Sequence, residues 1–179
     1  MKEYWQSARK EMHNVASLTG AALLAALSPV LDLLTITVNQ FLEISFTSLT
    51  HAVTGFLYGP VVGALAGGMA DIIKYLIKPT GAFFPGFTLN EILTGFIYGV
   101  MFYKKDVRFS RVIRAKLIVT TGINLLLTPL WLSFMYGSAY KVMVPARIIK
   151  NLIMLPVDIF ILNIVLKFAD KNIRKRRIK

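Results

Sequence analysis

Long apolar stretches, separated by short polar or basic segments, run along almost the whole chain. The first, 15–34, follows a polar start that carries Lys2, Arg9 and Lys10. It is too long for the apolar core of a signal peptide, and no small-residue cleavage site follows it. We therefore predict an uncleaved first membrane helix that enters from the cytoplasm. The alternation of apolar and polar residues over 35–47 predicts a short extended hairpin in an external loop.

The next apolar stretch, 48–77, is interrupted by Gly59-Pro60. Proline lacks a backbone donor and disfavours helix at the residue before it, yet it suits the first position of a new helix. We therefore predict two helices in this stretch, with a break at Gly59.

Thr88-Leu89-Asn90-Glu91 has the spacing of a capping box and predicts the start of the following helix, after a loop over 78–87 that is rich in Pro, Gly and Phe. A basic connector, 104–116, and a second external loop, 136–144, separate the remaining apolar stretches. The expected fold is an all-α membrane protein, a single domain over 1–179 with an outward-facing ligand cavity. Its six predicted transmembrane helices are 15–34, 48–58, 60–77, 88–103, 117–135 and 145–168.

Composition and charge placement support a membrane protein. Hydrophobic residues make up 55% of the chain, the mean hydropathy is +0.60, and only 17% of residues are charged, below the quarter or so that is usual in soluble domains. The net charge of +12 would suit nucleic acid, but no Lys or Arg occurs between Lys10 and Lys74. The basic residues form short clusters between apolar runs, which is the pattern of topology signals, so we exclude a nucleic-acid partner.

The basic clusters also favour an even number of spans. With six spans, 16 of the 21 Lys and Arg residues lie in the N-terminal segment, the connector and the C-terminal tail, and both termini are cytoplasmic. Five spans would place one basic terminus outside, against the positive-inside rule.

Catalytic chemistry finds little support in the sequence. The absence of cysteine excludes disulfides and thiolate metal sites. His13 and His51 lie far apart, and no metalloprotease, nucleophile-elbow or P-loop motif occurs. We therefore expect no enzyme activity, metal or cofactor, and we expect His51 to be a packed residue. Without a P-loop, uphill transport would need a partner or an ion gradient.

Polar residues within the last predicted helix are better candidates for a site. Arg147, Lys150, Asn151, Met154 and Asp158 form one stripe at helical spacing. Charges inside a membrane helix are costly and mark a functional site by default, although Arg147 and Lys150 would also suit snorkelling to the interface. The cationic upper end of the stripe favours an anionic ligand that arrives from outside.

Acidic and aromatic residues complete the candidate ligand set. Asp71 and Lys74 lie one turn apart and form either an internal ion pair or part of the site, while Glu91 is a helix cap by position and a ligand candidate second. Aromatic residues at the same outer level suit either an interfacial belt or stacking against a flat heterocycle. The aromatic candidates are Phe84, Phe87 and Trp131.

Small residues at four-residue spacing indicate close helix packing, either within the bundle or against another membrane protein. These pairs are Ala21/Ala25, Ala22/Ala26, Gly55/Gly59, Gly63/Gly67 and Gly95/Gly99.

Several of these runs together resemble the substrate-binding S component of energy-coupling factor (ECF) vitamin transporters, and the resemblance covers nearly the whole chain. The last two runs look most like the folate-specific members. The matching runs are Ala21-Ala22-Leu23-Leu24-Ala25-Ala26, Tyr58-Gly59-Pro60 with Gly63 and Gly67, Phe83-Phe84-Pro85-Gly86-Phe87-Thr88, and Pro145-Ala146-Arg147-Ile148-Ile149-Lys150-Asn151.

The resemblance implies six helices and high-affinity vitamin capture from outside a bacterial cell, in a cavity lined by the outer loops and helices four to six. It also implies a transmembrane coupling subunit and two cytoplasmic ATPases as partners. An alanine pair of the first helix would contact the coupling subunit, either Ala21/Ala25 or Ala22/Ala26. Asp158 departs from the amide that the resemblance leads us to expect.

Folate agrees with the residues themselves. Its rings are flat, and its two carboxylates suit Arg147 and Lys150, with arginine binding in a bidentate manner. Asn151 and Asp158 would serve the pterin, and the Phe loop would stack on the rings. Open alternatives are riboflavin, pantothenate, the cationic and therefore poorly matched thiamine, a queuosine precursor, or a membrane enzyme or assembly factor with no vitamin ligand.

Overall fold

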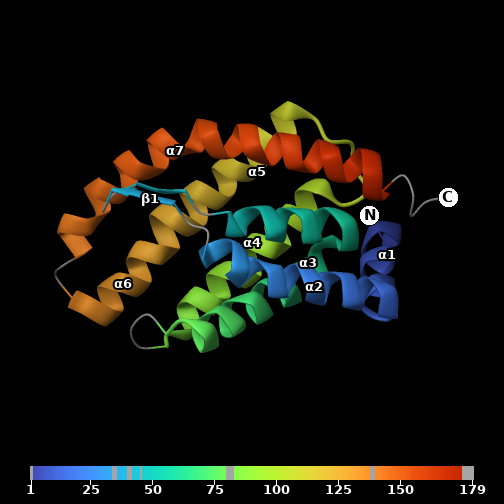
Figure 1. Cartoon of the computed structure of the whole chain (residues 1–179), viewed down its shortest axis with the longest axis horizontal. Coiled ribbons are helices and arrows are strands. Elements are labelled where there is room, and N and C mark those ends of the chain that lie inside the picture. Colours follow the sequence, from blue (N-terminus) through green and yellow to red (C-terminus); the bar gives the residue numbers. More distant parts are fainter. Residues whose placement is uncertain are drawn as a thin grey trace.

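The computed structural model describes residues 2–33, 36–39, 42–44, 46–79, 83–137 and 140–174. Its helices are α1 Lys2–Met12, α2 Val15–Leu33, α3 Thr47–Ile77, α4 Pro85–Phe102, α5 Phe109–Ile118, the π-helical η1 Val119–Leu127, α6 Thr128–Tyr136, α7 Tyr140–Ala169 and the π-helical η3 Asp170–Arg174. Two short strands, β1 Ile36–Asn39 and β2 Leu42–Ile44, pair antiparallel between α2 and α3. The long helices form one bundle, with α1 across the end where α7 finishes and β1 near the opposite end (Figure 1).

α3 is a helical hairpin rather than one straight helix. Gly59 has φ 88° and ψ 178°, a conformation that only a residue without Cβ adopts at low cost. A Cβ built on Gly63 would lie 3.1 Å from the Cα atom of Gly55, whereas a straight helix would separate these residues by about 12 Å. The chain therefore reverses at Gly59, and the predicted break at Gly59-Pro60 is confirmed.

The bundle contains six helical segments. Among the described residues, four helical stretches are long and apolar enough to cross a membrane, namely α2, α3, the continuous run from α5 through α6, and α7. Because α3 is folded back on itself, it supplies two segments, and α4 supplies the sixth with 18 mostly apolar residues. A helix of that length is about 27 Å long, close to the thickness of the hydrocarbon core.

The basic connector predicted over 104–116 is largely helical. α5 already begins at Phe109 and continues without a break into η1 and α6. Arg108, Arg111 and Arg114 recur at every third position, while Val112, Ala115 and Lys116 are buried. The predicted start at 117 was therefore wrong, because the density of charge concealed an amphipathic helical period.

Two other helices also begin earlier than predicted. α7 begins at Tyr140 rather than at Pro145, so the loop predicted over 136–144 is shorter. α4 begins at Pro85, which occupies a first-turn position that suits proline, and its N-cap Phe84 makes no side-chain capping bond. The capping box predicted at Thr88 is therefore wrong.

The polar start of the chain forms α1, a helix that the sequence analysis did not predict. Ala8 is fully buried. The Tyr103 hydroxyl donates to Glu11 Oε1 at 3.2 Å, and the Tyr4 hydroxyl donates to the carbonyl of Gly99 at 3.1 Å. Burial and the neighbouring Tyr103 raise the pKa of Tyr4 to about 12, so this hydroxyl remains a donor throughout the physiological pH range. These contacts fix α1 to the end of α4.

Glycine pairs hold α3 and α4 together, backbone against backbone. A Cβ on Gly63 would lie 2.8 Å from the carbonyl oxygen of Gly95, and a Cβ on Gly55 would lie 2.6 Å from the backbone nitrogen of Gly99. Such an approach leaves no room for a side chain. The glycine pairs found in the sequence therefore pack this chain's own bundle.

We predict that Gly95→Ala destabilises the protein. The new methyl group would meet the backbone of Gly63, and overpacking of this kind costs about 1–3 kcal/mol. The measurement is the thermal unfolding midpoint of the detergent-solubilised protein. Gly122→Ala is the matched control, because a Cβ there meets no described atom within 4 Å. Equal midpoints for the two variants would contradict close α3–α4 packing.

Candidate ligand pocket

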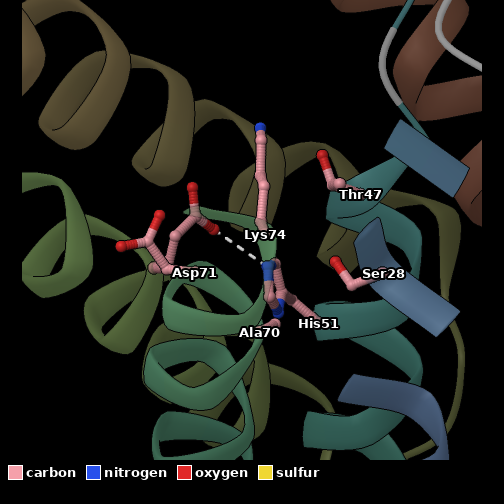
Figure 2. A pocket seen from close by; sticks show the side chains of 7 residues that line it. Ser28, Thr47, His51, Ala70, Asp71 and Lys74 are labelled. Atoms are coloured by element: carbon pink, nitrogen blue, oxygen red, sulfur yellow. Dashed lines mark ion pairs between the residues drawn. The ribbon is translucent and has the colours of Figure 1, made fainter. Parts of the chain in front are cut away.

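Polar side chains converge between α2, the two arms of α3 and α4, near the end of the bundle opposite α1. Figure 2 shows the pocket, with side chains of the two arms of α3 facing one another across it. His51 and Asp71 come together because the chain reverses at Gly59 between them. The lining residues are Ser28, Thr47, His51, Ala70, Asp71, Lys74 and Glu91.

The most buried charged contact of the pocket joins His51 to Glu91. Their Nε2 and Oε2 atoms lie 2.9 Å apart, and the exposed fractions of the two side chains are 5% and 38%. His51 therefore holds the Glu91 carboxylate in place, while part of the Glu91 side chain remains exposed at the pocket. The predicted role of Glu91 as a helix cap is wrong, because α4 begins six residues earlier. His51 is packed as predicted, but it also positions a candidate ligand group.

Asp71 and Lys74 do not form the ion pair that their spacing allowed. Lys74 Nζ lies 3.0 Å from Asp32 Oδ2 on α2 instead. The Thr88 hydroxyl donates to Asp71 Oδ2 at 2.7 Å. The pocket thus offers two carboxylates, one on each of two helices, each held by a single neighbour.

An aromatic wall, formed by Phe84, Phe87 and Trp131, stands beside this pocket on α4 and α6. The ring centroid of Phe84 lies 6.0 Å from that of Phe87 and 5.8 Å from that of Trp131. The structure therefore brings the three predicted aromatic residues together.

Asn90 anchors the aromatic wall to α4. The Trp131 Nε1 group donates to Asn90 Oδ1 at 3.0 Å, and Asn90 Nδ2 donates to the Thr128 hydroxyl at 3.1 Å. Asn90 is buried and directly precedes Glu91 in the chain. The second turn of α4 thus carries both a pocket carboxylate and the support of the aromatic wall.

The described part of the predicted stripe on α7, from Lys150 to Asp158, faces the bundle. Met154 is buried, while Lys150 and Asn151 are half-buried. The side chain of Arg147 lies outside the part of the structure that is described. Asp158 Oδ2 contacts Lys116 Nζ at 2.8 Å, so in this structure its carboxylate is paired within the bundle. Lys116, which the sequence analysis counted among the connector charges, is buried as well.

Sequence reasoning missed the lining residues Ser28 and Thr47, and it also missed three residues that hold the side chains around the pocket. Asp32, Thr88 and Asn90 each make a polar contact that shapes the site. The available signal was that each is a polar residue next to or within an apolar stretch, where side chains of this kind are costly unless they are partnered. Within the described ranges, no cluster of three or more His, Asp or Glu side chains forms a metal site.

The pocket is small. Its empty volume is about 230 Å³, and this figure includes space that is open to solvent. A ligand with several rings would therefore extend beyond the lining residues.

Fold and family define a polytopic helical membrane protein, with a candidate ligand pocket at one end of its bundle. The family model for the ECF transporter, substrate-specific component, matches residues 16–166. This chain belongs to that family, as the sequence resemblance indicated.

Relatives and a solved structure agree with this membership. The chain is 35% identical over 133 residues to "Folate transporter FolT" of Clostridium novyi (strain NT), covering 74% of this chain and 77% of that protein. It is 35% identical over 152 residues to "Folate transporter FolT" of Leuconostoc mesenteroides, covering 79% and 82%. The structure titled "Crystal structure of FolT bound with folic acid" matches with a TM-score of 0.77 at 36% identity, covering 85% of this chain and 94% of that one.

We predict that Asn90 and Trp131 act as a unit. Asn90→Ala would leave the partly buried indole N–H of Trp131 without its acceptor, and a hydrogen bond of this kind contributes about 0.5–1.5 kcal/mol. Thermal unfolding of Asn90→Ala, Trp131→Phe and the double variant measures this coupling. The double variant should lose clearly less stability than the sum of the two single losses. Additive losses would show that the bond does not hold the aromatic wall.

Proposed function

We propose that this chain is the folate-binding subunit of an ECF-type importer, which captures folate outside the cell and delivers it through a coupling subunit. The observation that carries the proposal is the carboxylate pocket beside an aromatic wall, on a backbone that matches a folic acid-bound relative with a TM-score of 0.77. The role is that of a binding subunit rather than an enzyme, and the ATPase activity belongs to its partners.

The pocket suits the pterin ring. A pterin carries an amino group next to a ring N–H, two donors that point the same way and match the two oxygens of a carboxylate. Glu91 is open to the pocket by 38% of its side chain and is held in place by His51. We assign Glu91 as the first acceptor and Asp71 as the second.

The rest of folate extends out of the pocket. The benzoyl ring stacks on the aromatic wall, because offset aromatic pairs prefer centroid separations of about 4.5–7 Å, as in the wall itself. The glutamate tail then reaches the outer part of α7, where Arg147 and Lys150 bind its carboxylates. Asn151, which the sequence led us to match with the pterin, adds a hydrogen bond to this tail instead.

The test of this function is direct binding to the purified protein. Folate should bind in isothermal titration and should quench the fluorescence of Trp131, the one tryptophan left in a Trp5→Phe background. Riboflavin, pantothenate and thiamine, titrated in parallel, should not compete. Preferential binding of one of these vitamins would replace folate as the substrate.

We predict that Arg147→Ala weakens folate binding by roughly ten- to a hundredfold, because a charge-assisted hydrogen bond contributes about 1.5–3 kcal/mol. A pterin without the glutamate tail should lose much less. Arg147→Lys should recover only part of the loss, since it keeps the charge but not the planar fork. Isothermal titration with both ligands measures this. Equal losses for both ligands would rule out the carboxylate assignment.

Charge placement supports the orientation of the protein in a bacterial cytoplasmic membrane. α1 and the end of α7 lie at one end of the bundle, together with the exposed basic residues of the α4–α5 connection (Figure 1). The positive-inside rule places this end in the cytoplasm. Both termini are then cytoplasmic, and the pocket opens outward.

The two alanine pairs of α2 differ in exposure. Ala21 and Ala25 are buried against α3, with exposed fractions of 4% and 3%. Ala22 and Ala26 are exposed on the face of α2 that points away from the bundle. Of the two pairs that the family resemblance implicates, we therefore assign Ala22/Ala26 to the coupling subunit, which works together with two cytoplasmic ATPases.

We predict that Ala22→Trp or Ala26→Trp abolishes uptake but leaves folate affinity within about twofold, because a bulky side chain prevents close helix approach at an exposed face. The measurements are uptake in cells that carry the complete transporter, and titration of the isolated subunit. Ala21→Trp is the contrasting variant and should destabilise the subunit itself. Normal uptake by both exposed-face variants would exclude this docking surface.

A further inference from the structure

A buried ion pair lies outside the proposed ligand site. Lys116 on α5 and Asp158 on α7 are 2.8 Å apart, with side-chain exposures of 6% and 23%. Charges inside a membrane bundle are expensive, and a buried pair often contributes no more stability than apolar residues of the same size. Its presence therefore calls for a role other than stability.

The surroundings offer these two charges little else. Ala115, Ile159 and Leu162 belong to the apolar core around the pair. Tyr98 on α4 belongs to the same core and is fully buried, yet its hydroxyl has no hydrogen-bond partner among the residues described. A rotation of α7 would thus strand both charges in apolar surroundings.

Asp158 shares its helix face with the proposed ligand residues. Asn151, Met154 and Asp158 follow at helical spacing, and Met154 is buried between them. Asn151 lies seven residues from Asp158, about 10 Å along the helix axis. Each residue of register shift turns a helix by about 100°, which would move Asn151 from the bundle interior toward lipid.

We propose that the Lys116–Asp158 pair sets the rotation of α7 and so aims its outer, ligand-binding part at the cavity. Lys116 and Asp158 are positioning residues that do not touch the ligand. Apolar contacts alone fix such a rotation poorly, because lipid and helix interior are equally apolar surroundings for Leu or Ile. A single buried polar contact that fixes register at some cost in stability is a known device in helical assemblies. This assignment rests on the proposed folate function.

The experiment compares stability with affinity in Lys116→Met, Asp158→Leu and the double variant. Each single variant strands one charge and should lose both thermal stability and folate affinity. The double variant should regain the thermal midpoint of the wild type, yet bind folate at least about tenfold more weakly, because nothing then fixes the rotation. The reversed pair, Lys116→Asp with Asp158→Lys, should recover most of the affinity.

Tyr98→Phe is the control at similar depth, since it removes a hydroxyl that has no hydrogen-bond partner in the described structure. Its affinity and midpoint should match the wild type. A double variant with wild-type affinity would overturn the proposal, even where the single variants fail to fold.

A ligand-independent readout separates this proposal from the folate assignment. The chain has no cysteine, so the labelling rate of Asn151→Cys by a water-soluble maleimide reports which way this face of α7 points. The double Met/Leu background should change that rate at least threefold. Ile153→Cys, exposed on α7 and about 200° around the helix axis from Asn151, reports the opposite face. Unchanged labelling would overturn the proposed rotation, whereas a wild-type protein that binds no folate would overturn only the function.

Discussion

The contact between the backbones of α3 and α4 is the constraint on which the rest of this structure depends. Gly63 faces Gly95 with no space for a side chain, and the reversal at Gly59 places both arms of α3 against neighbouring helices. His51 and Asp71 reach one pocket from the two arms, and Glu91 reaches it from α4. A wider separation of these helices would leave three polar side chains in lipid surroundings without partners.

The low dielectric of the bundle explains how the charges are arranged. A buried charge is tolerated where it is paired, and here His51 meets Glu91 and Lys116 meets Asp158, while the more exposed Lys74 meets Asp32. Glu91 differs from the buried His51 and Lys116 because part of its side chain remains open to the pocket. An acceptor that is fixed on one side and accessible on the other is suited to a ligand with paired donors, which is the chemistry of a pterin.

The sequence predicted those features that follow from periodicity and backbone chemistry. Apolar spacing predicted the six helical segments, and the position of Pro60 predicted the break at Gly59. The placement of the aromatic residues predicted that Phe84, Phe87 and Trp131 lie together. Helix starts were less predictable, because α5 hides an amphipathic period behind its charges and α4 uses Pro85 instead of a polar cap.

Side-chain partners were the least predictable part. Asp71 and Lys74 lie one turn apart, and nothing in their spacing shows that each binds a residue of a different helix. The sequence likewise indicates that Lys116 is a connector charge, and only the structure shows that it pairs with Asp158 of α7. Such choices depend on which helices are neighbours, which is information that a single sequence carries only through the family resemblance.

The most direct measurement of the central claim is a structure of this protein with folate bound. We expect the amino and ring N–H groups of the pterin within hydrogen-bond distance of the Glu91 or Asp71 carboxylate, the benzoyl ring against Phe84 or Trp131, and the glutamate carboxylates next to Arg147 and Lys150. Folate bound with its pterin away from the carboxylates of Glu91 and Asp71, or with its glutamate carboxylates inside the pocket that His51 lines, would contradict this account.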